Sequence, residues 1–105
     1  MNETVKSWVQ LLEAEWSKPE GFLGKVREGV FDQRRAADFL TMLENIKLPA
    51  SETSIDRRLV SLLWYIQNVL GWQMHRVIEQ GGDCTVFEHF ANQVQGTIEE
   101  ILGVP

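Results

Sequence analysis

The side chains of this sequence that could do chemistry are two histidines and one cysteine, all in the last third of the chain. His75 lies four residues before Glu79, so the two share a helix face, and His89 directly follows Glu88. Cys84 precedes a predicted helix start, where the pKa of a thiol can fall and the thiol becomes reactive. No HExxH or comparable spacing occurs, and a lone cysteine forms no internal disulfide. We therefore predict incidental histidines and cysteine, with no metal, no cofactor and no catalytic residue.

Two further patterns, paired acids and a GxxG segment, could indicate hydrolysis or RNA binding, but the rest of the chain does not support either. The acid pairs Glu13/Glu15 and Glu99/Glu100 are one or two residues apart, so the carboxylates of a pair point in different directions on a helix. Hydrolysis by two opposed carboxylates is therefore not indicated. The segment GFLGK, residues 21–25, has the GxxG spacing of an RNA-binding loop, but that domain needs strands and a basic field. We expect a non-enzymatic protein that does not bind nucleic acid.

Tryptophan is unusually frequent, with four residues in 105. We expect Trp8 and Trp16 to help fill the core. Trp72 differs, because it follows Gly71 in the segment GWQMHR, which ends at Arg76. Tryptophan and arginine are enriched at the energetic centres of protein interfaces. Trp72 and Arg76 are therefore predicted to lie on a partner-binding surface.

The net charge of −5 is concentrated at the carboxyl-terminal end. Residues 1–76 contain ten acids and ten basic residues, so they are neutral, whereas residues 77–105 contain acids and no Lys or Arg. An unbalanced acidic end attracts basic surfaces, although it can also be a solvated helix face. As binding residues for a basic protein partner we predict the five acids of this end: Glu79, Asp83, Glu88, Glu99 and Glu100.

Apolar residues recur at three- and four-residue spacings, which predicts helices throughout. We expect the first helix to begin at a cap on Asn2 or Thr4, and a short one to end at Gly29. The five expected helices cover residues 5–17, 19–29, 33–47, 55–80 and 86–102. The first three are bounded by Pro19, by Gly29 and by Pro49 with the polar linker 50–54.

Capping residues refine these boundaries. Asp32 is expected to cap the third helix and Ser54 the fourth, while residues 85–88 have the spacing of a capping box for the fifth. Gly71 can break the fourth helix, bend it or be tolerated within it. Because the apolar side of the fourth helix is broad, we expect this helix at the centre of the bundle.

These features predict an all-α fold, a compact antiparallel bundle of four to five helices forming a single domain over residues 1–105. The first residues lack a basic leader, no apolar run is long enough for a membrane span, and Cys84 is unpaired. We therefore expect a cytoplasmic protein with no membrane association. A second subunit could instead complete one of the apolar stripes, giving a homodimer.

The segments GFLGKVREGVFD (21–32) and SLLWYIQNVLGWQ (61–73), in a short acidic helical chain, resemble bacterial toxin-immunity proteins. The resemblance implies a non-enzymatic protein that binds and neutralises a basic toxin domain, for example a nuclease. Acidic residues would then steer the partner into place. The alternatives are a self-associating structural helical protein and a small-ligand-binding helical domain.

Overall fold

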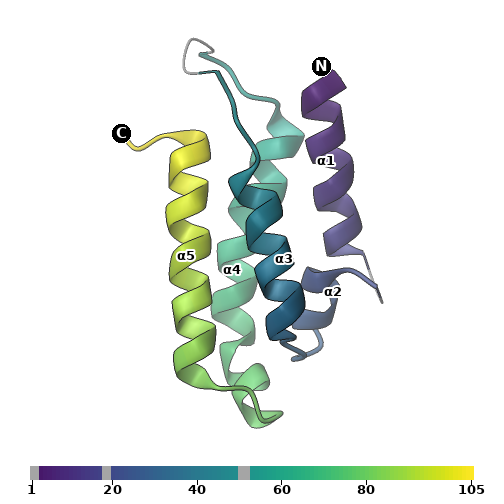
Figure 1. Ribbon diagram of the computed structural model, residues 1–105, viewed down its shortest axis with the longest axis vertical. Helices are drawn as coiled ribbons and strands as arrows, with labels where there is room; N and C mark the ends of the chain where they lie inside the picture. Colours follow the sequence, from purple (N-terminus) through teal and green to yellow (C-terminus); the bar gives the residue numbers. More distant parts are fainter. Residues whose placement is uncertain (1–2, 18–19, 50–52) are drawn as a thin grey trace.

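The computed structural model describes residues 3–17, 20–49 and 53–105, and within them it contains five helices and no strand (Figure 1). The all-α prediction and the number of helices are therefore confirmed. The helices, in chain order, are α1 (Glu3–Trp16), α2 (Phe22–Val26), α3 (Gln33–Glu44), α4 (Arg57–Glu79) and α5 (Cys84–Leu102).

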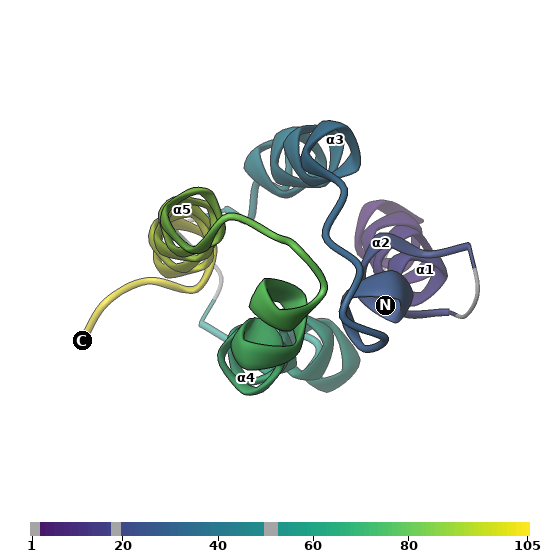
Figure 2. The ribbon, with the colours of Figure 1, turned by 90° about the horizontal axis from the view of Figure 1, so that it is seen from below.

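The four long helices run along the 44 Å axis of the molecule and alternate in direction along the chain (Figure 1). In the end view, α4 lies across from α3, with α5 on one side and α1 and α2 on the other (Figure 2). Helix α4 contacts α1, α2 and α5, whereas α3 contacts α2 and α5. Within the part of the chain that the structure describes, the side of α4 that faces away from these three neighbours is therefore left without a neighbouring element.

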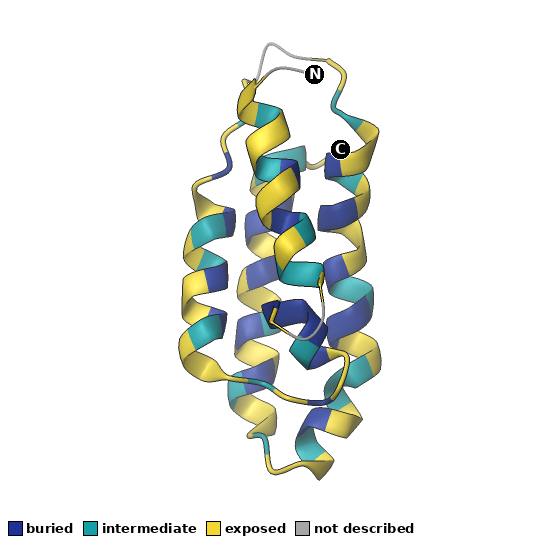
Figure 3. Cartoon of the chain, turned by 90° about the vertical axis from the view of Figure 1, so that its right-hand side faces the viewer, coloured by how far each residue is buried: buried dark blue, intermediate teal, exposed yellow. Residues whose placement is uncertain are grey.

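The core is built from the apolar stripe of each helix, and Figure 3 shows the buried positions on the inward sides of the helices and the exposed positions on the outward sides. Its centre is a group of aromatic rings around Phe22, a 2 % exposed residue of α2. The Phe22 ring lies 5.0 Å from the ring of Phe39 and 5.5 Å from that of Phe90, between centroids. Phe31 lies 5.0 Å from Phe87 and joins the loop after α2 to α5. The five-residue α2 is thus held by packing, because so short a helix is not stable alone.

Aspartates cap three of the helices. The Asp32 carboxylate accepts hydrogen bonds from the backbone N–H groups of Arg34 and Arg35, as predicted. The prediction for the fourth helix was wrong: Asp56, not Ser54, is the cap, and its carboxylate accepts from Leu59 N at 3.0 Å. A charged oxygen also interacts favourably with the positive end of the helix dipole, which a serine hydroxyl does less well.

The boundary predictions for α5 and α1 also need correction. Asp83 caps α5 by accepting from Val86 N at 3.1 Å, so α5 begins at Cys84 and the expected capping box does not start the helix. Thr4 lies inside α1, because the helix already includes Glu3. The alternative cap on the second residue and the boundary at the first proline lie outside the described residues, as does part of the expected 50–54 linker.

The remaining boundaries differ by a few residues. Helix α3 ends at Glu44 rather than near Lys47, and α2 ends at Val26. Gly29 has φ +84°, the left-handed conformation expected of it, but it lies in the turn after the helix. Helix α4 is continuous through Gly71. It forms one wall of the bundle rather than its enclosed centre, because its outer side carries exposed residues.

We expect Phe22→Ala to lower the free energy of unfolding by about 3–5 kcal/mol, because it removes a ring that packs on several others and leaves a cavity. The measurement is urea denaturation followed by circular dichroism. Leu11→Ala is the control, since Leu11 is 47 % exposed and its truncation should change the free energy of unfolding by no more than about 0.5 kcal/mol. Equal effects of the two substitutions would contradict the proposed role of Phe22.

Candidate binding surface

The outward side of α4 carries three large exposed aromatic residues. Trp64 is 57 % exposed, Tyr65 45 % and Trp72 66 %. They lie on the side of α4 that faces away from its buried stripe. With 3.6 residues per turn, positions 64, 65 and 72 point away from the buried positions, which are 59, 62, 63, 66, 69 and 70. Helix α3, across the bundle, has no exposed large hydrophobic residue. We call Trp64, Tyr65 and Trp72 the aromatic face.

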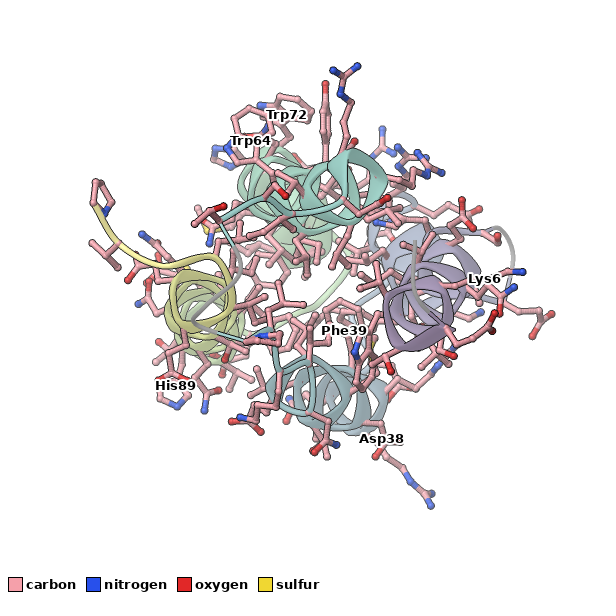
Figure 4. All side chains as sticks on the ribbon, turned by 90° about the horizontal axis from the view of Figure 1, so that it is seen from above. Lys6, Asp38, Phe39, Trp64, Trp72 and His89 are labelled. Atoms are coloured by element: carbon pink, nitrogen blue, oxygen red, sulfur yellow. The ribbon has the colours of Figure 1, made fainter. Side chains whose placement is uncertain are left out.

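The Tyr65 ring contacts both tryptophan rings on the surface. The rings of Trp64 and Tyr65 are 5.6 Å apart between centroids and those of Tyr65 and Trp72 are 6.3 Å apart, both edge to face. In Figure 4, Trp64 and Trp72 project from α4 away from the bundle, whereas Asp38 projects from α3 on the opposite side. Rings that already support each other lose little conformational freedom when a partner covers them.

Gly71 leaves an opening beside the aromatic face. Apart from its chain neighbours and the backbone of its own helical turns, a Cβ atom built at Gly71 would meet no atom of the described residues within 4 Å, so packing between the helices does not require glycine here. Glycine within a helix costs about 1 kcal/mol relative to alanine. Next to Gly71, a groove of about 350 Å³ runs between α4 and α5, with Met74 and Ala91 among its lining residues. The missing side chain therefore lets a partner approach the α4 backbone.

A second groove of about 350 Å³ borders the aromatic face on the α1 side. Its walls include Trp16, whose Nε1 donates to the Leu62 carbonyl at 3.2 Å. The Arg27 guanidinium lies over the Trp16 ring, 5.0 Å from its centroid. Arg58 forms an ion pair with Glu13 at 2.9 Å. Both arginines already have partners within the chain, so we regard this groove as a flank of the aromatic face rather than a separate anion site.

Of the residues predicted to bind a partner, the structure places Trp72 and Arg76 in different roles. Trp72 is the most exposed aromatic residue on α4. Arg76 is also exposed, but its Nη1 donates to the Arg27 carbonyl at 3.0 Å, and Gln80 donates to the Glu28 carbonyl. These bonds fix the turn after α2, and Gly29 is needed there because a side chain would collide with Arg76. Arg76 thus has a structural role beside the surface.

The five predicted acids do not form one surface, although all are exposed. Glu88 and Glu99 line grooves between α4 and α5, whereas Glu100 lines a groove between α3 and α5. The Asp83 carboxylate is occupied as the cap of α5, and Glu79 ends α4. From Asp83 to Glu100 the helix extends about 25 Å. Among the described residues none of these acids pairs with an arginine.

The histidines and the cysteine are not brought together. His75 is exposed on α4, and His89 lies in a groove between α3 and α5. No group of three His, Cys, Asp or Glu side chains that could hold a metal occurs in the described part of the chain. Desolvation, then the carboxylates of Glu88 and Asp83, raise the pKa of the Cys84 thiol above its ordinary value. A protonated thiol is a weak nucleophile.

Trp64 and Tyr65 were not among the residues predicted from the sequence to bind a partner. The spacing in the sequence could have identified this surface. Residues 64, 68 and 72 are four residues apart, so they lie on one side of the helix, opposite the leucine stripe. The apolar run 62–66 concealed it, because two of its five residues face outward.

Comparison with protein-family models, with curated proteins and with solved structures finds no significant match. Among the described residues, no helix combines the length and the apolar character needed to cross a bilayer.

We expect Glu88→Gln to speed the alkylation of Cys84 by iodoacetamide at pH 8. Glu88 Oε1 lies 3.6 Å from the Cys84 sulfur and its charge raises the thiol pKa, so its neutralisation should increase the thiolate fraction. The measurement is the pH dependence of the alkylation rate by mass spectrometry. Glu99→Gln, on the same helix but far from Cys84, is the control, and an equal effect of both substitutions would contradict this explanation.

Proposed function

We propose that this chain is a non-enzymatic protein-binding module whose recognition surface is the aromatic face of α4. The observation that carries the proposal is that Trp64, Tyr65 and Trp72 are exposed, with Tyr65 in contact with both tryptophans. They lie on a side of α4 that no other element of the described residues covers. Placing large aromatic residues in water is unfavourable, and clusters of this kind mark interfaces.

The shape of the aromatic face supports the binding of a protein over the binding of a small ligand. A small ligand is usually enclosed by a deep apolar cavity with converging polar groups. Here the rings form a ridge along the outward side of α4, from which Trp64 and Trp72 project (Figure 4), and the grooves beside it are open to solvent. A ridge with flanking grooves is complementary to a helix or another extended surface, which packs by placing its own side chains in the grooves.

A second proposal concerns the acids of the carboxyl-terminal part of the chain, from the end of α4 through α5. The five acids after residue 76 are exposed and have no arginine partner within the described residues, which supports the binding of a basic protein such as a toxin domain. Of these, Glu88 and Glu99 border the α4–α5 grooves, so this pair is the best placed to contact such a partner. This role is that of an immunity protein.

One experiment tests both proposals. Tagged wild-type protein is used to capture partners from an extract of the native host, in parallel with Trp64→Ala/Trp72→Ala and Glu88→Lys/Glu99→Lys. If the aromatic face is the recognition surface, the tryptophan variant should bind the captured partner with an affinity about 30-fold or more lower than that of the wild type. A loss of this size is expected when interface anchors are removed.

If α5 instead binds a basic partner, the Glu88→Lys/Glu99→Lys variant should fail to capture that partner. The affinity of the wild-type protein for it should also fall as the salt concentration rises. Leu11→Ala, an exposed apolar truncation on α1, controls for nonspecific effects. Thermal denaturation of each variant checks folding. Capture that is unchanged in the folded tryptophan variant would rule out the aromatic face as the recognition surface.

A further inference from the structure

We propose that the partner covering the aromatic face is a second copy of this chain, with the two α4 helices packed antiparallel about a two-fold axis at Asn68. This inference rests on the proposed function and names its partner. It follows from the order of residues along the outward side of α4, which is complementary to its own reverse.

The first step is the position of the charges. Arg57 is the first residue of α4 and Glu79 the last, and both are exposed. Neither has an ion-pair partner in the described ranges 3–17, 20–49 and 53–105. With the axis at Asn68, Arg57 of one copy faces Glu79 of the other, about 33 Å from the equivalent pair at the opposite end. A parallel pairing would instead place like charges together.

The helix dipole supports the same arrangement. A cation at the N-terminus and an anion at the C-terminus both oppose the dipole of their own helix. Arg57 and Glu79 are therefore unfavourably placed within an isolated α4. An antiparallel second copy brings Glu79 to the N-terminal end and Arg57 to the C-terminal end, so each unfavourable charge is neutralised by the partner.

The apolar residues match under the same operation. Trp64 of one copy faces Gly71 and Trp72 of the other. Tyr65 lies at the level of Gly71 of the other copy along the helix axis. Gly71 has open space where a side chain would be, and a groove lies beside it, so a tryptophan ring from the second copy can be accommodated. Without a glycine at this point, two helices that both carry large rings would be held further apart than the usual 8–10 Å.

The area available indicates a reversible dimer. An aromatic side chain presents ~150–250 Å², and these three are 45–66 % exposed, so the aromatic face supplies about 300–400 Å² per copy. A standard interface buries about 800 Å² per partner. The polar residues that share the ridge, among them Ser61, Asn68 and His75, must provide the remainder. Since each chain has a complete core of its own, we expect a folded monomer in equilibrium with a micromolar dimer.

The test is analytical ultracentrifugation of the full chain from 1 to 200 µM. Arg57→Glu and Glu79→Arg should each weaken the dimer by about tenfold, because by symmetry one substitution creates two like-charge contacts. The double variant Arg57→Glu/Glu79→Arg should restore association. An equimolar mixture of the two single variants should also associate, since both ion pairs are then re-formed. Trp72→Ala should abolish the dimer.

The matched control is Arg34→Glu, a charge reversal near the N-terminus of α3, which should leave association unchanged. Circular dichroism at 1 µM confirms that each monomer is folded. Two results would overturn the inference: a wild-type chain that remains monomeric at 200 µM, or a dimer that the double variant does not restore. A monomer that still captures a different protein through Trp64 and Trp72 would overturn only the second-copy proposal, not the proposed function.

Discussion

The burial of one side of α4 against α1, α2 and α5 is the contact on which the rest of the structure depends. Leu59, Leu63 and Ile66 are fully buried there, and they fix the rotation of the longest helix in the bundle. Once that rotation is fixed, the period of the helix determines what faces outward. The exposure of Trp64, Tyr65 and Trp72 is thus a direct consequence of core packing, and the core does not need them.

This separation of roles explains why the surface can be unfavourable locally. The outward side of α4 combines large exposed rings, an internal glycine and charges that oppose the helix dipole. Each of these features either lowers the free energy of unfolding of the isolated chain or adds nothing to it. Features that local stability does not explain are expected where a protein binds something else. Their concentration on a single helix side is the reason for assigning function to α4.

Much of the fold could be predicted from the sequence, because leucine and phenylalanine spacing defines helices strongly. The errors arose where several residues could do the same job. Ser54 and Asp56 are both good caps, as are Asp83 and Thr85. In the structure the aspartate is used in each case, because its carboxylate accepts the backbone N–H three residues later, from Leu59 and from Val86.

The candidate site was harder to predict because proximity in sequence was taken for proximity in space. Glu99 and Glu100 are adjacent in the chain but about 100° apart around α5, so they line different grooves. Trp72 was predicted on a partner-binding surface from the glycine before it and the polar residues after it, and it is exposed, whereas Trp64 lay within an apolar run and was missed. The orientation of each residue on its helix depends on which side the neighbouring helices cover.

The most direct test of the central claim is hydroxyl-radical footprinting of the four tryptophans, comparing the chain in native-host cells with the dilute purified chain. If the aromatic face is covered in the working protein, the oxidation of Trp64 and Trp72 should fall strongly in cells, while the half-buried Trp16 changes little. Equal oxidation of Trp64 and Trp72 in the two conditions would show that the aromatic face remains in water, and it would contradict the account.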